Sequence, residues 1–174
     1  MRVATTLMVP IITIAVFWLS PPEPSLAAEA RLDASVQGPL FSPTDGPLYP
    51  GGPALVRAVA LSYHGPPAAV LALYVSNLVP RTPASAHSCT APDPSQLLRF
   101  DVEQRGVTRY VGSIADFAET HGDSSDAMAL LSPRAGGWYD GDRTIVSLSV
   151  TLETSADNNF MGCLVGADIH WVAG

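Results

Sequence analysis

The sequence predicts an all-β protein: an antiparallel jelly-roll or Ig-like β-sandwich with one short helix, preceded by an N-terminal signal segment. Two observations support the sandwich. Apolar and polar residues alternate along several segments, which buries one face of each strand and exposes the other. Turn-forming Gly and Pro separate these segments, and only one stretch has a helical period.

The first thirty residues have the layout of a secretory signal. Arg2 is followed by an apolar run over residues 3–19, a Pro-rich break at 21–24 and small residues at 25–30. We expect cleavage after Ala27 or Ala30, so that the chain contacts a membrane only through this segment and only before cleavage. A retained anchor is the alternative. The predicted division is therefore 1–30 signal peptide, 31–46 N-terminal extension or edge strand, and 47–174 sandwich domain.

The N-terminal extension, residues 31–46, carries apolar residues among polar ones, namely Leu32, Val36, Leu40 and Phe41. Such a segment is competent to form a strand. It is able to pair with its own domain as an edge strand, or with a neighbouring subunit by strand addition. Both alternatives stay open from the sequence.

Alternation, apolar runs and the turns between them predict strands in six segments of the sandwich domain. They cover residues 54–63, 68–77, 98–102, 107–111, 146–152 and 163–172. His64-Gly65-Pro66-Pro67 joins the first pair and Arg105-Gly106 joins the third and fourth.

One segment predicts a helix of about two turns. Ser113 and Asp116 have the spacing of a capping box, and Ile114, Phe117 and Ala118 share one helical face. Residues 79–95 and 121–142 are rich in Pro, Gly, Ser and Asp, and we expect them to be loops.

Cys89 and Cys163 are the only cysteines. In an exported chain a pair of cysteines most simply forms one intramolecular disulfide, and loop entropy would give it about 4 kcal/mol of stabilisation. Free thiols or an intermolecular bond are the alternatives.

Charge and missing motifs exclude several function classes. The net charge is −7, and all nine basic side chains are arginine. An acidic surface without a basic cluster argues against nucleic acid and anionic lipid as partners, and the lack of lysine excludes Schiff-base chemistry. The chain has no G-x-S-x-G or H-E-x-x-H motif, and we interpret His170 as a polar-face strand residue. We expect no catalytic residue, no enzyme activity and no cofactor.

Two Asp-rich stretches are weak candidates for a metal site. They supply Asp123 and Asp126 in the first, and Asp140 and Asp142 in the second. Carboxylate oxygens at short spacing suit calcium, but neither stretch matches an EF-hand loop. The alternative is that these side chains cap backbone N–H groups in turns.

Two groups of aromatic residues lie at the ends of predicted elements. Trp138 and Tyr139 precede a turn, and Trp171 closes the last strand. Such rings usually fill the core of a sandwich, and an exposed pair would instead indicate a binding patch.

Short motifs in this chain resemble those of TasA/camelysin-like secreted proteins, in the versions found in high-GC Gram-positive bacteria. The turn at Pro50-Gly51 is similar to the family's opening. The closing half, with Asn158, Asn159, Gly162 and Trp171, is similar to its ending, although Met161 stands where glutamine is usual. The resemblance implies an exported sandwich. Relatives include biofilm matrix fibres and a metallopeptidase. For the two asparagines we expect a structural role, because asparagine tolerates left-handed backbone in a corner.

These observations favour a secreted, extracellular or cell-surface structural protein of matrix type that self-assembles through its N-terminal strand. Its partner would be another copy or a different extracellular protein. A monomeric extracellular binding module that uses the long loops and their aromatics is the alternative. A camelysin-like metallopeptidase is a remote third, for which no site can be carried over.

Overall fold

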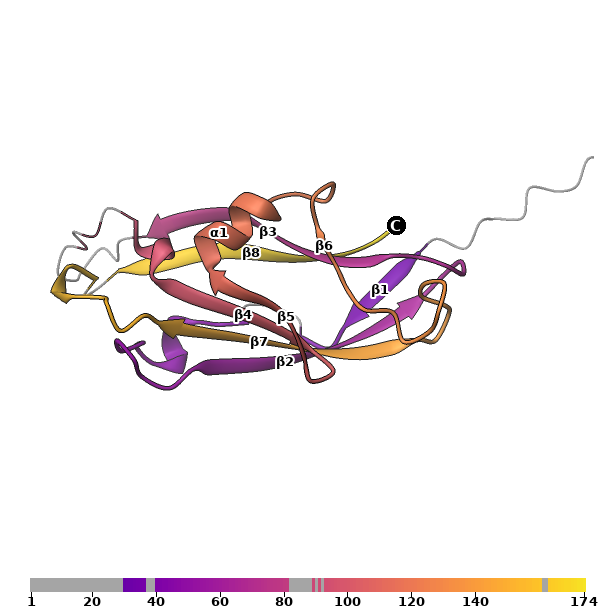
Figure 1. Ribbon diagram of the computed structural model, residues 1–174, viewed down its shortest axis with the longest axis horizontal. Helices are drawn as coiled ribbons and strands as arrows, with labels where there is room; N and C mark the ends of the chain where they lie inside the picture. The colour runs from indigo at the N-terminus through magenta and orange to yellow at the C-terminus, as the bar shows by residue number, and fades with distance from the viewer. Residues whose placement is uncertain (1–29, 37–39, 82–88, 90, 92, 161–162) are drawn as a thin grey trace, which may run out of the picture.

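The computed structural model describes residues 30–36, 40–81, 89, 91, 93–160 and 163–174. Within them the chain forms two antiparallel sheets that face each other (Figure 1). The larger sheet has the order β1 (Arg31–Ala34), β2 (Leu55–His64), β7 (Arg143–Leu152), β4 (Leu98–Gln104) and β5 (Val107–Ser113). The smaller sheet has the order β6 (Met128–Ala129), β3 (Leu71–Arg81) and β8 (Leu164–Ala173). The prediction of a mostly β, sandwich-like fold is confirmed. The predicted signal segment lies outside the described residues.

Among the described residues, one helix, α1 (Ile114–Thr120), accompanies the sheets, together with three short 3-10 turns. These turns are η1 (Pro43–Asp45), η2 (Pro94–Gln96) and η3 (Asn158–Phe160). The predicted cap is present, because the Ser113 side chain accepts a hydrogen bond from the Asp116 amide at 3.0 Å. Ile114 and Phe117 are buried on the predicted face. In the part of the chain that the structure describes, no helix has the length and apolar character needed to cross a membrane.

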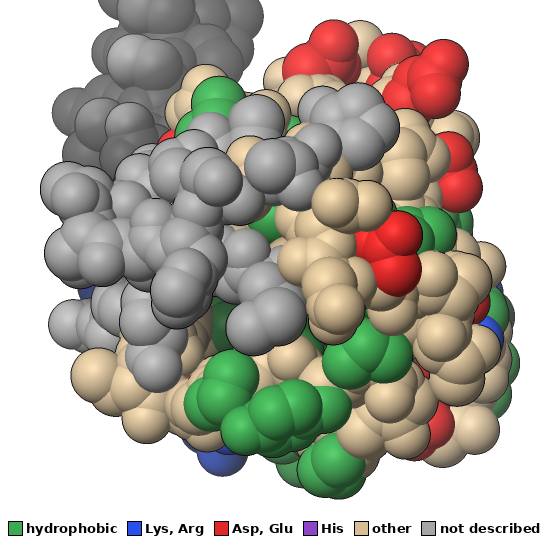
Figure 2. All heavy atoms as spheres, turned by 90° about the vertical axis from the view of Figure 1, so that its left-hand side faces the viewer, with side chains coloured by type: hydrophobic (Ala, Val, Ile, Leu, Met, Phe, Trp, Pro, Cys, Tyr) green, Lys and Arg blue, Asp and Glu red, His purple; other side chains and the backbone are tan. Residues whose placement is uncertain are grey.

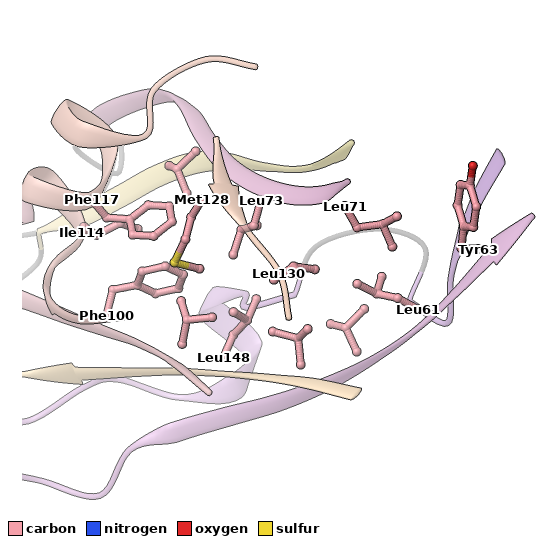
Figure 3. Packing of buried hydrophobic residues seen from close by; sticks show 14 of the residues in the cluster. Leu61, Tyr63, Leu71, Leu73, Phe100, Ile114, Phe117, Met128, Leu130 and Leu148 are labelled. Carbon is pink, nitrogen blue, oxygen red and sulfur yellow. The ribbon is translucent and has the colours of Figure 1, made fainter. Parts of the chain in front are cut away.

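The core lies between the two sheets and is filled from both (Figure 3). Near α1, Phe117 packs edge-on against Phe100, with ring centroids 5.2 Å apart, and both side chains are fully buried. Leu73 from the smaller sheet and Leu148 from the larger sheet meet further along the same layer. Along β2 and β7, buried residues alternate with more exposed ones, as the sequence pattern requires.

The hairpin of β4 and β5 is formed by the predicted Arg105-Gly106 turn. Both residues have positive φ, 56° and 79°, which is the backbone of a two-residue turn that follows the twist of the strands. Gln104 and Val107 face each other directly beside this turn.

Two predicted boundaries are wrong. Residues 79–81 were expected in a loop, but β3 continues to Arg81. The strand contains a bulge between Ser76 and Val79, where Asn77 has φ 51°, and this extra residue breaks the period-2 pattern. At its other end the strand begins at Leu71, because Ala68 has φ 66° and belongs to the preceding turn. The expected loop 121–142 also contains the short strand β6, whose register is Ala72 with Ala129.

Candidate functional site

The disulfide between Cys89 and Cys163 is present, with Cα atoms 4.8 Å apart. It connects the segment that follows β3 to the start of β8. A backbone hydrogen bond of 3.1 Å from the Ala91 amide to the Asn159 carbonyl lies beside it. The predicted bridge therefore fastens the chain around the beginning of the last strand.

The motif residues of the resemblance occupy structural positions. Pro50 bridges to Leu152 at the end of β7, and the Gly51 amide donates to the Leu152 carbonyl at 3.0 Å. Gly51 has φ 67°, and an added Cβ would lie 2.9 Å from the Thr154 methyl carbon, so this turn needs glycine. Trp171 is half-buried and faces Leu73 of β3. Gly162 lies outside the described residues.

The backbone of Asn158 and Asn159 does not adopt the left-handed conformation that we expect from the sequence for this corner. They form the 3-10 turn η3, and neither has a positive φ. The backbone amide of Asn159 donates to the Asp157 carboxylate at 2.9 Å, and its side-chain amide donates to the same group at 3.0 Å. The corner before β8 is therefore organised by an aspartate that accepts hydrogen bonds in a short 3-10 turn.

The four candidate metal ligands lie in turns, and the carboxylates of three of them, Asp123, Asp140 and Asp142, contact other protein groups. Asp123 accepts from the Ser125 amide at 2.7 Å, from the Ser125 hydroxyl and from the Asp126 amide. The Ser125 side-chain bond and these amide bonds lower the pKa of Asp123. Asp140 lies 3.3 Å from His64. Asp142 is buried, accepts from the Tyr139 amide and pairs with Arg134 at 2.9 Å. Among the described residues, no three His, Cys, Asp or Glu side chains are grouped as a metal site would require.

His170 lies on the outer face of the smaller sheet, as interpreted. Its ring stacks on Tyr74 with centroids 4.5 Å apart, and Nε2 lies 2.8 Å from the Ser76 hydroxyl. No local sequence pattern predicts this Ser–His contact, because it depends on the register between β3 and β8. Trp138 fills the core, with 1% of its surface exposed, so the long loop does not present it to a ligand.

The N-terminal segment (residues 31–46) is the first part of the candidate assembly site. β1 pairs antiparallel with the end of β2, from Arg31 opposite His64 to Ala34 opposite Leu61. Ser35 extends this contact, because its amide donates to the Ala60 carbonyl and its hydroxyl accepts from the Ala60 amide, both at 2.9 Å. The structure therefore places β1 in its own domain as an edge strand.

Beyond β1 the N-terminal segment continues to pack on the core through apolar side chains that are only partly buried, namely Val36, Leu40 and Phe41. The Arg57 guanidinium lies over the Phe41 ring, 5.9 Å from its centroid, and also pairs with Asp45. These contacts are exposed to solvent along one side of the sandwich. Contacts of this kind stabilise weakly, because water screens the charges and reaches the apolar groups.

β8 is the second part of the candidate assembly site. It has ten residues and is the outermost strand of the smaller sheet in the described structure. None of its side chains is fully buried, although Val165, Ala167, Ile169 and Trp171 pack against the core. β1 lies against β8 but pairs only with β2. The side of the sandwich that carries β1 and β8 is therefore covered incompletely by the described residues (Figure 1).

A shallow depression lies on the outer face of the larger sheet, with a volume of about 330 Å³. Its lining includes Ser147 and Ser149 of β7, and Glu103 and Asp101 of β4 lie directly opposite them. Arg99 contacts Asp101 at 3.0 Å within it. The depression combines hydroxyl, carboxylate and guanidinium groups.

Where described residues are visible in Figure 2, acidic side chains lie toward the top and right of this end of the molecule, and basic side chains appear at its edges. This surface fits the overall charge of −7. The exclusion of nucleic acid as a partner stays a prediction.

In comparisons with known proteins, no family model and no curated protein matches this chain. The resemblance to TasA/camelysin-like proteins stays a prediction that rests on the short motifs described above.

Proposed function

We propose that this chain is an exported extracellular structural protein that self-associates when its N-terminal segment pairs with a neighbouring copy in place of its own domain. The observation that carries the proposal is the way this segment is held. It fills the edge of β2 through the short strand β1 and partly exposed apolar contacts. An identical site on a neighbour offers the same contacts, so exchange changes the free energy little.

Two further observations support export and assembly. A disulfide persists in oxidising compartments outside the cytoplasm, and this chain has one. The proposed signal sequence would deliver the chain there and leave a new N-terminus next to β1. A short terminal strand next to a free end is the element that strand addition uses.

We further propose Ig-like rather than jelly-roll connectivity. An Ig sandwich has strands A, B, E and D in one sheet and C, F and G in the other. The order β1-β2-β7-β4 corresponds to A-B-E-D, and β3-β8 corresponds to C-F. The position beside β8 then corresponds to strand G.

The test uses a cross-link that reports where β1 is paired. Asp33 and Ser62 face each other across β1 and β2, so the double substitution Asp33→Cys with Ser62→Cys places two thiols within disulfide reach. If the segment is exchanged, oxidation of assembled protein gives covalent multimers on a non-reducing gel. If assembled protein gives only cross-linked monomers, exchange is wrong.

Deletion of residues 31–46 is the complementary experiment. We expect the folded variant to lose assembly by light scattering and electron microscopy. The control is Asp33→Ala, which removes the ion pair with Arg31 and leaves the β1 backbone in place. A folded deletion variant that assembles as well as the original chain contradicts the proposal.

The binding module is the second candidate function, and the depression on the larger sheet favours it. Its mixed hydroxyl and charged lining suits a ligand rich in hydroxyl groups. Under this candidate the protein stays monomeric at every concentration, and Ser147→Trp, which fills the depression, removes binding of oligosaccharides. If Ser147→Trp leaves oligosaccharide binding unchanged, or if none is detected, this candidate fails.

A further inference from the structure

The edge of β8 that faces away from β3, with which no described strand pairs, has a defined backbone pattern. Val70 and Gly174 exchange backbone hydrogen bonds of 2.7 and 3.0 Å beside the strand, which fixes the alternation along the ladder. Even-numbered residues of β8 therefore direct N–H and C=O groups toward β3. The odd-numbered residues direct theirs away from β3, toward the open edge. Their side chains, including those of Ile169 and Trp171, face the core.

The other edges of the described sheets are shorter or covered. β1 is short and carries the Arg31–Asp33 ion pair. β5 is paired with β4 in an antiparallel ladder that contains a bulge. The outer side of β3 is closed by hydrogen bonds from the Val75 amide to the His121 carbonyl and from the Leu130 amide to the Leu71 carbonyl. Among the described edges, that of β8 is long and mostly apolar, and β8 has no proline or bulge of its own, two features that natural edges use against pairing.

We propose that two copies of this chain associate through β8, antiparallel, with Ile169 on the two-fold axis. Antiparallel pairing of identical edges gives a closed dimer and joins the two smaller sheets into one. With Ile169 at the centre, the odd-numbered residues from 165 to 173 face one another. These are the residues whose N–H and C=O groups point to the open edge, so the hydrogen bonds form in register.

Charge complementarity selects this register. With Ile169 on the axis, Asp168 of each copy faces His170 of the other, on the outer face of the joined sheet. A shift that places Asp168 on the axis also keeps the hydrogen-bond alternation, but it sets the two Asp168 carboxylates opposite each other. Like charges directly opposite in a sheet are destabilising. The inner face is complementary too, because Trp171 then faces the small Ala167 of the other copy.

This dimer is a second interface, separate from the exchange of the N-terminal segment. It uses no residue of 31–46, so loss of one interface leaves the other measurable. The proposed Ig-like order agrees with it, because the strand in the position of β8 is paired on both sides in an Ig sandwich.

The test is a charge exchange measured by sedimentation velocity over a concentration series, in mildly acidic solution where histidine is charged. Asp168→Arg sets arginine opposite His170, and His170→Asp sets two carboxylates opposite each other. We expect each single variant to raise the dimer dissociation constant about tenfold and the double variant to restore it. Because His170 also contacts Ser76 and Tyr74, thermal unfolding of each variant checks the fold.

A backbone variant makes the test independent of side-chain charge. The Ala167 N–H points to the open edge, so Ala167→Pro removes a donor to the second copy and no donor to β3. Ala167→Ser keeps that N–H and is the matched control. We expect Ala167→Pro to be monomeric and Ala167→Ser dimeric. A monomeric original chain at high concentration overturns the proposal. So does association that requires residues 31–46 and is indifferent to all of these substitutions, because exchange of the N-terminal segment at β2 would then account for all of the association.

Discussion

The two long sides of this sandwich differ in how completely the gap between the sheets is covered. On one side, α1 and the loop that follows it close the gap between the sheets. Phe117 is fully buried between Phe100 and Tyr110, with centroid distances of 5.2 and 4.8 Å, and the outer edge of β3 is hydrogen-bonded. On the other side, β1 and the N-terminal segment lie over the core with partly exposed side chains, and within the described residues no strand pairs with the outer edge of β8.

The difference indicates where stability and where assembly reside. Full burial of aromatic rings and satisfied backbone groups contribute most of the stabilisation a small core offers. Unpaired backbone groups and half-buried apolar side chains stabilise a single copy less. They contribute more stabilisation when a second copy covers them. The closed side therefore holds the fold, and the open side is the surface on which we expect association.

The largest effect should come from opening the closed side. Phe117→Ala removes a fully buried ring and its two edge-on contacts, and we expect it to lower the free energy of unfolding by about 3–5 kcal/mol. Leu32→Ala on the open side is the control, and we expect about 1 kcal/mol because Leu32 is only partly buried. Chemical denaturation measures both. Equal losses in the free energy of unfolding would mean that the two sides contribute equally to stability.

The next prediction concerns the disulfide, which holds the start of β8 on the open side. Replacing Cys89 and Cys163 by serine frees the start of β8 from the segment after β3, and loop entropy gives a loss of up to about 4 kcal/mol. We expect the loss in thermal unfolding, together with faster amide hydrogen exchange at the start of β8. The closed side near α1 should keep its protection in the folded state. Unchanged exchange at β8 would show that the bridge does not order this edge.

The sequence predicted the elements of both sides better than their arrangement. Period-2 alternation is a local signal, and it located β2, β4, β7 and β8 to within a few residues. Ser113 and Asp116 likewise marked the start of α1. The bulge at Asn77 hid the end of β3, because one extra residue reverses the alternation. β6 is too short to leave a pattern.

The candidate site depends on information that a local pattern does not contain. The disulfide was predictable from the two cysteines together with the predicted signal segment. The open edge of β8, the pairing of β1 with β2 and the contact of Ser76 with His170 follow from strand order and register. Long-range packing sets that order. The asparagine corner was misjudged for a similar reason, since its backbone is determined by Asp157 and by the bridge beside it.

The smallest expected effect concerns the loop that protects the edge of β3. Asp123 holds this loop by accepting hydrogen bonds from Ser125 and the Asp126 amide, and the His121 carbonyl in the same loop accepts from the Val75 amide. Asp123→Asn removes the ionised acceptor. We therefore expect faster hydrogen exchange at the Val75 amide near neutral pH, with little change in the free energy of global unfolding. Asp126→Asn is the matched control. In this variant the exchange rate of the Val75 amide should stay near that of the original chain.

The pH dependence of that effect follows from the lowered pKa of Asp123. A carboxyl group whose pKa is lower in the folded than in the unfolded state stabilises the fold above the unfolded value, which is about 3.9 for aspartate. The stabilisation is lost as the pH falls through the lower, folded value. The difference between the original chain and Asp123→Asn should therefore be present at neutral pH and shrink in strong acid, as followed by exchange at Val75 and by titration of the Asp123 carboxyl in NMR spectra. A difference that grows as the pH falls would mean that the carboxylate does not hold this loop. The protection of the β3 edge would then come from the backbone contacts alone. The hydrogen bonds of Asp123 would in that case contribute little to closing this side of the sandwich.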